Sequence, residues 1–167
     1  MNVCIYRTLQ PVKGKYFRTL RKSRKVNHMN QKTKVIFVCT HNSARSQMAH
    51  GLLQAIGGDA FDVYSAGTES TLVKPFAIQA LADSGIDISH HTSDHIDKYM
   101  DQDFDYVITV CDSAHETCPY FPSTKEKLHW SFEDPSNATG DDAQKLQAFI
   151  ESRKLIEKKL RHYFNLP

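Results

Sequence analysis

The stretch that most constrains this chain covers residues 35–46 and reads VIFVCTHNSARS. Four apolar residues precede Cys39, a polar loop follows it, and a helical pattern begins near Ala44. This order predicts a strand, a tight loop and the N-terminus of a helix, with five residues between Cys39 and Arg45. Such a loop can direct successive backbone N–H groups at one point, where together with the positive helix end they bind a tetrahedral oxyanion.

Cys39 is expected to act as a nucleophile at the centre of that loop. The same field lowers the pKa of a thiol, so we expect Cys39 to be a thiolate at neutral pH. Arg45 can hold two oxygens with its planar guanidinium, and Ser46 can donate its hydroxyl to the sulfur. The predicted substrate-binding residues are those of the loop: Thr40, His41, Asn42, Ser43, Ala44, Arg45 and Ser46. The alternative is a buried structural cysteine beside an incidental arginine.

The first 31 residues differ in charge from the rest of the chain. Residues 1–31 hold eight Lys or Arg and no acid, whereas the remainder holds 13 Lys or Arg against 19 acids. We interpret residues 1–31 as a basic N-terminal extension and residues 32–167 as a single catalytic domain. The extension could be a translated region upstream of a start at Met29, a basic arm for nucleic acid, or an organelle transit segment; we favour the first.

Cysteine content and hydropathy argue against two classes of protein: disulfide-rich secreted proteins and proteins that span a membrane. Four cysteines without a zinc-ligand spacing favour reduced thiols in a cytoplasmic protein over a disulfide framework. No run approaches the roughly 18 apolar residues that a membrane span needs. His90, His91 and His95 include an i,i+4 pair, but no third ligand is evident, so we predict no metal site there.

Strand and helix patterns alternate along the body of the chain. Strands are expected at residues 35–39, 61–65, 105–111 and 128–130. Helices are expected at residues 44–57, 75–82 with Gly85 as the C-cap, 94–99 with Ser93 as the N-cap, and 141–164. The alternation predicts an α/β fold with a parallel sheet. Because ligands bind outside the carboxyl ends of parallel strands, Cys39 and Cys111 are expected on the same rim.

Cys111 and Cys118 form a candidate thiol pair. Seven residues of helix span about 10.5 Å, whereas a disulfide needs Cα atoms within about 7 Å, so a Cys111–Cys118 bond would require the segment to unwind. A relay in which Cys111 attacks Cys39 and Cys118 then attacks Cys111 would use that motion; two unrelated small hydrophobic residues are the alternative. Asp134, in the loop Glu133-Asp134-Pro135, can protonate a leaving oxygen opposite the thiolate.

Five segments together resemble one family: CTHNSARSQMA, VYSAGTES, GIDISHHTSDHID, DYVITVCDSAHETCP and HWSFEDP. They follow the order found in thioredoxin-coupled arsenate reductases of the low-molecular-weight protein tyrosine phosphatase fold, over nearly all of residues 34–164. The resemblance implies an α/β fold with a four-stranded parallel sheet flanked by helices on both faces. It also implies arsenate as the substrate, with phosphate or sulfate as mimics.

The resemblance further implies a role for each thiol. Cys39 would attack arsenic(V) in the loop while Asp134 protonates the departing hydroxyl. Cys111 would then attack Cys39 and release arsenite. Cys118 would attack Cys111 and leave a Cys111–Cys118 disulfide, which thioredoxin reduces.

No tightly bound cofactor is implied, but some members of the family hold a potassium ion. Its ligands match Asn42, Ser65 and Asp94 here, whereas the position of a glutamate ligand carries His50. The resemblance therefore leaves a potassium ion open at this place.

Three other functions could use the same residues. A phosphatase acting through a phospho-cysteine would use Cys39, Arg45 and Asp134, but it would not need Cys111 or Cys118. The aromatic residues expected after Asp-Pro in a phosphotyrosine phosphatase are also missing. A non-enzymatic module could bind an oxyanion, and the extension could bind nucleic acid. We favour a monomeric reductase that uses thioredoxin, with glutaredoxin and glutathione as the alternative, and contacts neither nucleic acid nor membrane.

Overall fold

Four parallel strands form the sheet, in the order β2-β1-β3-β4. Their bounds are Thr33–Cys39 (β1), Phe61–Gly67 (β2), Tyr106–Thr109 (β3) and Glu126–His129 (β4). The apolar run of β1 is buried from Val35 to Cys39, as expected for an inner strand that is covered on both faces. The predicted four-stranded parallel sheet is confirmed.

The computed structural model describes residues 31–117 and 125–167. The predicted extension, with Met29, and the third thiol, Cys118, lie outside the described residues. The division of the chain at residues 31 and 32 stays a prediction.

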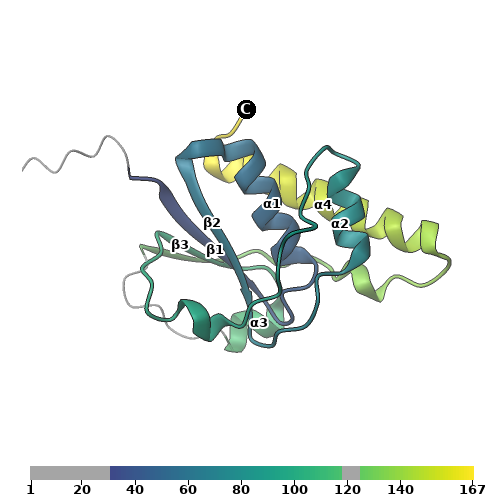
Figure 1. Ribbon diagram of the computed structural model, residues 1–167, viewed down its shortest axis with the longest axis horizontal. Helices are drawn as coiled ribbons and strands as arrows, with labels where there is room; N and C mark the ends of the chain where they lie inside the picture. The colour runs from purple at the N-terminus through teal and green to yellow at the C-terminus, as the bar shows by residue number, and fades with distance from the viewer. Residues whose placement is uncertain (1–30, 118–124) are drawn as a thin grey trace, which may run out of the picture. The chain divides into compact units, whose positions relative to one another are not determined.

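The α-helices are Arg45–Gly57 (α1), Pro75–Ala82 (α2), Asp112–Thr117 (α3) and Asp142–Phe164 (α4). Three 3₁₀ turns are Gly58–Ala60 (η1), Ile96–Tyr99 (η2) and Pro135–Asn137 (η3). α1, α2 and α4 contact one another and lie together beside the sheet in Figure 1, whereas α3 contacts β1 and β3. α4 begins with a capping box, in which Asp141 and Gln144 satisfy each other's backbone N–H groups. In this packing, α3 and the loops lie at the carboxyl ends of β1 and β3.

The predicted C-terminal glycine of α2 is confirmed: Gly85 has φ +80°, and the N–H groups of Gly85 and Ile86 donate to the Ala82 and Leu81 carbonyls and close the helix end. One predicted helix and the bounds of the strands are wrong in detail. The helix predicted at residues 94–99 is the single turn η2, and its N-cap is His95, because the Ser93 hydroxyl is donated to the His41 carbonyl instead. β3 is shorter than predicted, and β4 begins two residues earlier. Cys111 thus follows the end of β3 by two residues rather than ending the strand.

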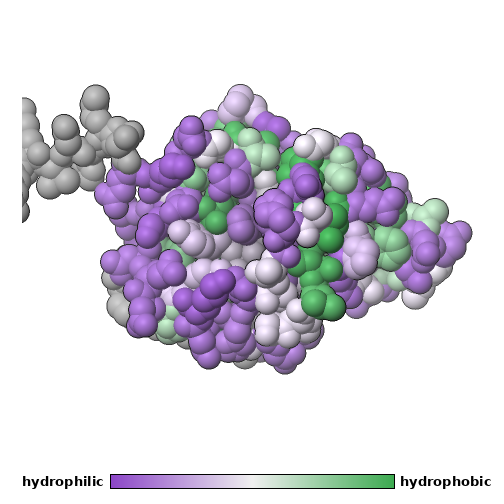
Figure 2. Space-filling view, viewed as in Figure 1, coloured by the Kyte–Doolittle hydropathy of each residue, from purple (hydrophilic) through white to green (hydrophobic). Residues whose placement is uncertain are grey.

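The face shown in Figure 2 is largely hydrophilic, with a narrow apolar strip beside α2. Among the described residues, the large apolar side chains that are mostly exposed are Leu72 and Leu155. No helix in the described part of the chain combines the length and the apolar character that a membrane crossing requires.

Candidate active site

The loop between β1 and α1 is held in place through its carbonyl groups. Each carbonyl of residues 39–44 accepts a hydrogen bond from a neighbouring segment or from α1. The donors, in order, are Thr68 N–H, Glu69 N–H, the Ser93 hydroxyl, the Gln47 amide, Lys74 N–H and Met48 N–H. Because a trans peptide unit is planar, each adjoining N–H points the opposite way, toward the interior of the loop. The Asn42 N–H does so, since it lies 3.1 Å from Cys39 Sγ.

Asn42 is the residue around which the loop is built. Its backbone is left-handed, with φ +47°, a conformation that costs a non-glycine residue roughly 1 kcal/mol or more. The side chain is fully buried and donates to Ser46 Oγ at 2.9 Å. Its Oδ1 accepts from Gln47 Nε2 at 2.8 Å and from the Asp94 N–H at 2.9 Å. These bonds hold the strained backbone that turns its N–H toward the sulfur.

Gly67, at the end of β2, lies against the same loop. A Cβ atom there would lie 2.7 Å from the Thr40 carbonyl oxygen and 2.8 Å from the Asn42 nitrogen. Both distances are shorter than any real Cβ contact, and both partners are backbone atoms that cannot rotate away. Only glycine lets the loop approach β2 this closely.

Cys39 is buried, and its sulfur lies 2.9 Å from Ser46 Oγ in addition to the Asn42 N–H. Burial raises the pKa of the Cys39 thiol, while the hydrogen bonds from Ser46 and Asn42 act in the opposite direction. The net shift is upward, so the predicted lowering of this pKa is wrong for this structure. Desolvation, together with the neighbouring Cys111 thiol, outweighs the hydrogen bonds.

The substitution Ser46→Ala is expected to slow alkylation of Cys39 by iodoacetamide at pH 7 on the order of tenfold. A hydrogen bond to a charged group contributes about 1.5–3 kcal/mol, and its loss disfavours the reactive thiolate. The pH at which alkylation is half-maximal should rise, as followed by mass spectrometry of the Cys39 peptide. Ser43→Ala is the matched control, since Ser43 is buried in the same loop but is not a hydrogen-bonding partner of the sulfur in the described chain. Equal effects of the two substitutions would contradict the role of Ser46.

Arg45, the first residue of α1, joins the loop to the segment that carries Asp134. Its Nη2 lies 2.6 Å from Asp134 Oδ2, and its Nη1 donates to the Phe132 carbonyl at 2.9 Å. The other carboxylate oxygen of Asp134 accepts the Ser136 N–H at 2.9 Å and caps η3. The guanidinium therefore holds one carboxylate oxygen and one backbone carbonyl, and it brings together two predicted residues that lie 89 positions apart.

Cys111 lies at the same rim as Cys39. Its buried sulfur is 3.4 Å from Thr40 Oγ1, on the residue next to Cys39. A cavity of about 580 Å³ opens here, and its lining includes Thr40, Arg45, Cys111 and Asp134. The structure thus brings together the loop, the arginine, the acid and two of the three predicted thiols.

Three of the residues matched to a potassium site, His50, Ser65 and Asp94, line a smaller cavity of about 250 Å³, and Asn42 is joined to Asp94 by a hydrogen bond. Their oxygen atoms already have protein partners. Asn42 Oδ1 accepts two N–H groups, and Asp94 Oδ2 accepts the Lys98 ammonium and the Tyr99 hydroxyl, each at 2.7 Å. His50 contributes a ring nitrogen 3.2 Å from Ser65 Oγ instead of a carboxylate. These side chains therefore suit a potassium ion poorly, and the chemistry of Cys39 is derived without a cation.

His50 is expected to make the protein less stable in acid. Burial, helped by the neighbouring rings of His91 and His90, lowers the pKa of His50 to about 3, against about 6.5 in an unfolded chain. Its contribution is complete above pH 6.5 and is lost progressively as pH falls toward 3, which amounts to about 2 kcal/mol at pH 5. Urea unfolding at pH 7.5 and pH 5 should show that His50→Gln removes most of this loss. His162→Gln, at an exposed position, should not. Parallel pH dependence in both variants would contradict this assignment.

Within residues 31–117 and 125–167, no group of three His, Cys, Asp or Glu side chains could hold a metal ion. Two structural roles were missed by sequence reasoning. Asn42 was predicted only as a loop residue and cation ligand, and Gly67 was given no role. Two signals could have identified them: an Asn two residues before the helix N-cap at Ala44, and a Gly as the last residue of a buried strand.

The first strand of the parallel sheet ends on a buried cysteine, and the loop that follows is lined with backbone amides and closed by an arginine. This arrangement defines a class of protein suited to thiol chemistry on an oxyanion. The family model described as low molecular weight phosphotyrosine protein phosphatase matches residues 34–166, and the chain belongs to this family.

The relatives of this chain include arsenate reductases. An arsenate reductase of Halalkalibacterium halodurans is 46% identical over 135 residues, which are 81% of this chain and 96% of the relative. The solved structure of an arsenate reductase in the phosphate binding state is 36% identical, with a TM-score of 0.68 over 78% of this chain and 95% of that one. A thioredoxin-dependent arsenate reductase of Corynebacterium glutamicum is 28% identical, with a TM-score of 0.62 over 82% of this chain and 62% of that one. The predicted resemblance to arsenate reductases is confirmed.

Proposed function

We propose that this chain reduces arsenate to arsenite, with Cys39 as the nucleophile. The observation that carries the proposal is the second buried thiol, Cys111, which shares the rim with Cys39 and lines the cavity that Arg45 and Asp134 also line. A hydrolase needs one thiol and water, whereas a two-electron reduction of arsenic needs two thiols. The similarity to arsenate reductases supports the same substrate.

Arsenate binding begins with competition for Arg45. An oxyanion in the loop would accept the inward N–H groups of residues 40–45 and the guanidinium that now holds Asp134. Asp134 is thereby released to face the departing oxygen. Arg45 and the inward N–H groups hold the negative charge of arsenate, and the Cys39 thiol passes its proton to the Asp134 carboxylate as the sulfur attacks. The attack forms an S–As bond and breaks an As–O bond, and Asp134 gives this proton to the oxygen, which leaves as water.

Reduction is complete when the second thiol acts. Cys111 attacks the sulfur of Cys39, an S–S bond forms, and the S–As electron pair stays on arsenic, which leaves as arsenite. Two thiols are oxidised to one disulfide while arsenic(V) becomes arsenic(III), so the electrons balance. The Thr40 hydroxyl, 3.4 Å from Cys111 Sγ, is placed to orient the attacking sulfur.

The third thiol would then return Cys39 to its reduced form. Cys118 attacks Cys111, and the resulting disulfide is presented to thioredoxin, the reductant named for one solved relative. α3 spans the whole interval between these two cysteines. Because a helix of this length holds its ends too far apart for a disulfide, the proposal requires α3 to unwind after the second step.

One assay tests the relay. Arsenite release is followed with thioredoxin, thioredoxin reductase and NADPH, for the wild type and for Cys118→Ser. The variant should release at most one arsenite per chain, because its Cys39–Cys111 disulfide is not passed on. Cys4→Ser is the matched control and should turn over as the wild type does. Sustained turnover by Cys118→Ser would contradict the relay.

Phosphatase activity is the second candidate, because the family model bears that name and the same loop would bind phosphate. Hydrolysis of p-nitrophenyl phosphate should depend on Cys39 and survive Cys111→Ser, whereas arsenite release should need both thiols. If the wild type hydrolyses the ester but releases no arsenite with either thioredoxin or glutaredoxin and glutathione, the phosphatase assignment replaces the reductase.

A further inference from the structure

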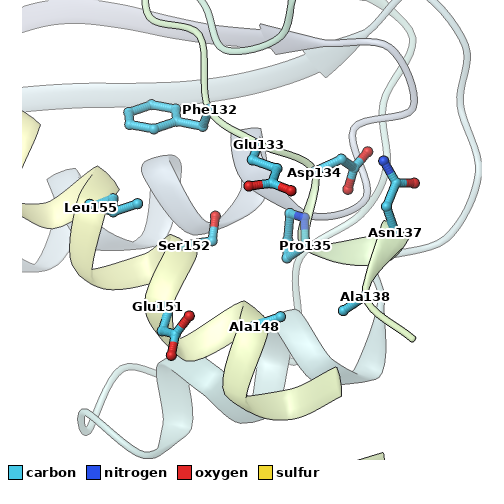
Figure 3. A pocket seen from close by; sticks show the side chains of 10 residues that line it. All are labelled: Phe132, Glu133, Asp134, Pro135, Asn137, Ala138, Ala148, Glu151, Ser152 and Leu155. Atoms are coloured by element: carbon cyan, nitrogen blue, oxygen red, sulfur yellow. The ribbon is translucent and has the colours of Figure 1, made fainter. Parts of the chain in front are cut away.

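A second cavity lies beside the loop that carries Asp134, between residues 132–138 and α4 (Figure 3). Its volume is about 280 Å³, at the lower end of ligand pockets, which suits a side chain or a small molecule. Much of its wall is apolar and is formed by Phe132, Pro135, Ala138, Ala148 and Leu155. This cavity shares Phe132, Glu133, Asp134 and Asn137 with the one that Cys111 and Arg45 line, but its other walls come from Pro135, Ala138 and α4, and the chemistry described above makes no use of those.

Ser152 supplies an unpaired polar group to this cavity. The residue is 7% exposed, and its hydroxyl finds no hydrogen-bond partner within residues 31–117 and 125–167. Figure 3 shows the hydroxyl directed from α4 toward the segment that carries Glu133. A buried hydroxyl without a partner is unfavourable, and a helical serine usually avoids it by bonding to the preceding turn. Ser152 is therefore available to bond with a group that enters the cavity.

The charged side chains that line the cavity are all acidic. Glu133 and Glu151 lie exposed at its rim, and no lysine or arginine of the described residues forms an ion pair with either. The third acid, Asp134, is already paired with Arg45. The local field therefore favours a positive charge, and the apolar wall favours a hydrocarbon stem next to it.

We propose that this cavity binds an aliphatic cation, which is either the end of a lysine or arginine side chain from a protein partner or a small free amine. The cation donates to the Ser152 hydroxyl and pairs with Glu133. Its methylene stem lies along Leu155 and Ala148, where Leu155 gains cover for its exposed side chain. The bound cation also contacts the loop that positions Asp134. This contact is the same whether the neighbouring site takes arsenate or another oxyanion.

Three probes with the same four-carbon stem test the proposal: n-butylammonium, 1-butanol and pentanoate. Each is titrated into the ¹⁵N-labelled full chain and followed in ¹H–¹⁵N correlation spectra. Butylammonium should shift resonances of residues 132–138 and 148–155 and bind about fivefold more tightly than butanol, as expected for one partly exposed ion pair. Pentanoate should shift none of them. Equal binding of butanol and butylammonium, or no shifts with any probe, would overturn the proposal.

Two variants locate the cation. Ser152→Ala removes an unpaired hydroxyl, so its thermal midpoint should equal or exceed that of the wild type while its affinity for butylammonium falls about threefold. Glu133→Gln should abolish the preference for butylammonium over butanol. Asp101→Asn, an exposed acid on a different loop, is the matched control and should bind as the wild type does. Wild-type binding by both Ser152→Ala and Glu133→Gln would refute this site.

A fourth probe separates the two sources of the cation. Nα-acetyl-L-lysine N-methylamide carries the same ammonium on a peptide backbone. If it shifts the same resonances with an affinity within about threefold of butylammonium, the site accepts a side chain of a protein partner. If butylammonium alone binds, the site takes a free amine.

Discussion

The substitution Gly67→Ala is expected to lower the rate of arsenite release at least about a hundredfold and to reduce the free energy of unfolding by about 2–3 kcal/mol. A Cβ atom at this position would overlap the Glu69 carbonyl oxygen and lie within 2.8 Å of Thr40 and Asn42 backbone atoms. The loop must therefore move away from β2. Overpacking of this kind costs about 1–3 kcal/mol, and a displacement of about 1 Å at a reacting group costs about 10²-fold in rate.

The matched control for this prediction is Gly58→Ala. Gly58 has φ +53° and ψ −137° but open space around its Cα, so alanine there should cost about 1–3 kcal/mol through backbone strain alone and leave the rate unchanged. Urea unfolding gives the stabilities, and the thioredoxin-coupled assay gives the rates. Wild-type turnover by Gly67→Ala would show that the loop does not need its close approach to β2.

The elements near the nucleophile could be predicted from the sequence because their signals are local. The apolar run before Cys39 gives a buried strand, and Pro75 fixes the start of α2. Asp141, with Gln144 three residues later, fixes the start of α4. Predictions failed where the local signal was weak, as at η2, whose cap is formed by the His95 ring, a group that cap preferences do not anticipate.

The state of the site could not be predicted, because it depends on contacts between distant parts of the chain. The loop and Arg45 predicted an oxyanion site, but the pairing of Arg45 with Asp134 spans 89 positions. The pKa of Cys39 depends on how completely the fold buries it, and no spacing in the sequence reports that balance. Residue types therefore proposed the participants, whereas the pairing of Arg45 and the direction of the Cys39 pKa shift needed the tertiary structure.

Asn42→Ala is expected to lower the free energy of unfolding by about 4 kcal/mol and arsenite release by about a hundredfold. The fully buried side chain makes three hydrogen bonds, to Ser46, Gln47 and the Asp94 N–H, and alanine leaves these groups without a partner. Each unsatisfied buried group costs about 1–3 kcal/mol, in part relieved by local relaxation. Alanine also bears the left-handed strain at φ +47°, so the Asn42 N–H should turn away from Cys39 Sγ.

Asn42→Gly separates the two contributions. Glycine loses the same three hydrogen bonds but adopts a positive φ without strain, so the alanine variant should be about 1 kcal/mol less stable than the glycine variant. The difference between the wild type and Asn42→Gly then measures the side-chain bonds. If these bonds hold the N–H on the sulfur, the pH profile of Cys39 alkylation should move upward in both variants. A glycine variant that keeps wild-type stability and profile would mean that the loop is held by its carbonyl contacts alone, and that Asn42 is needed only for its backbone conformation.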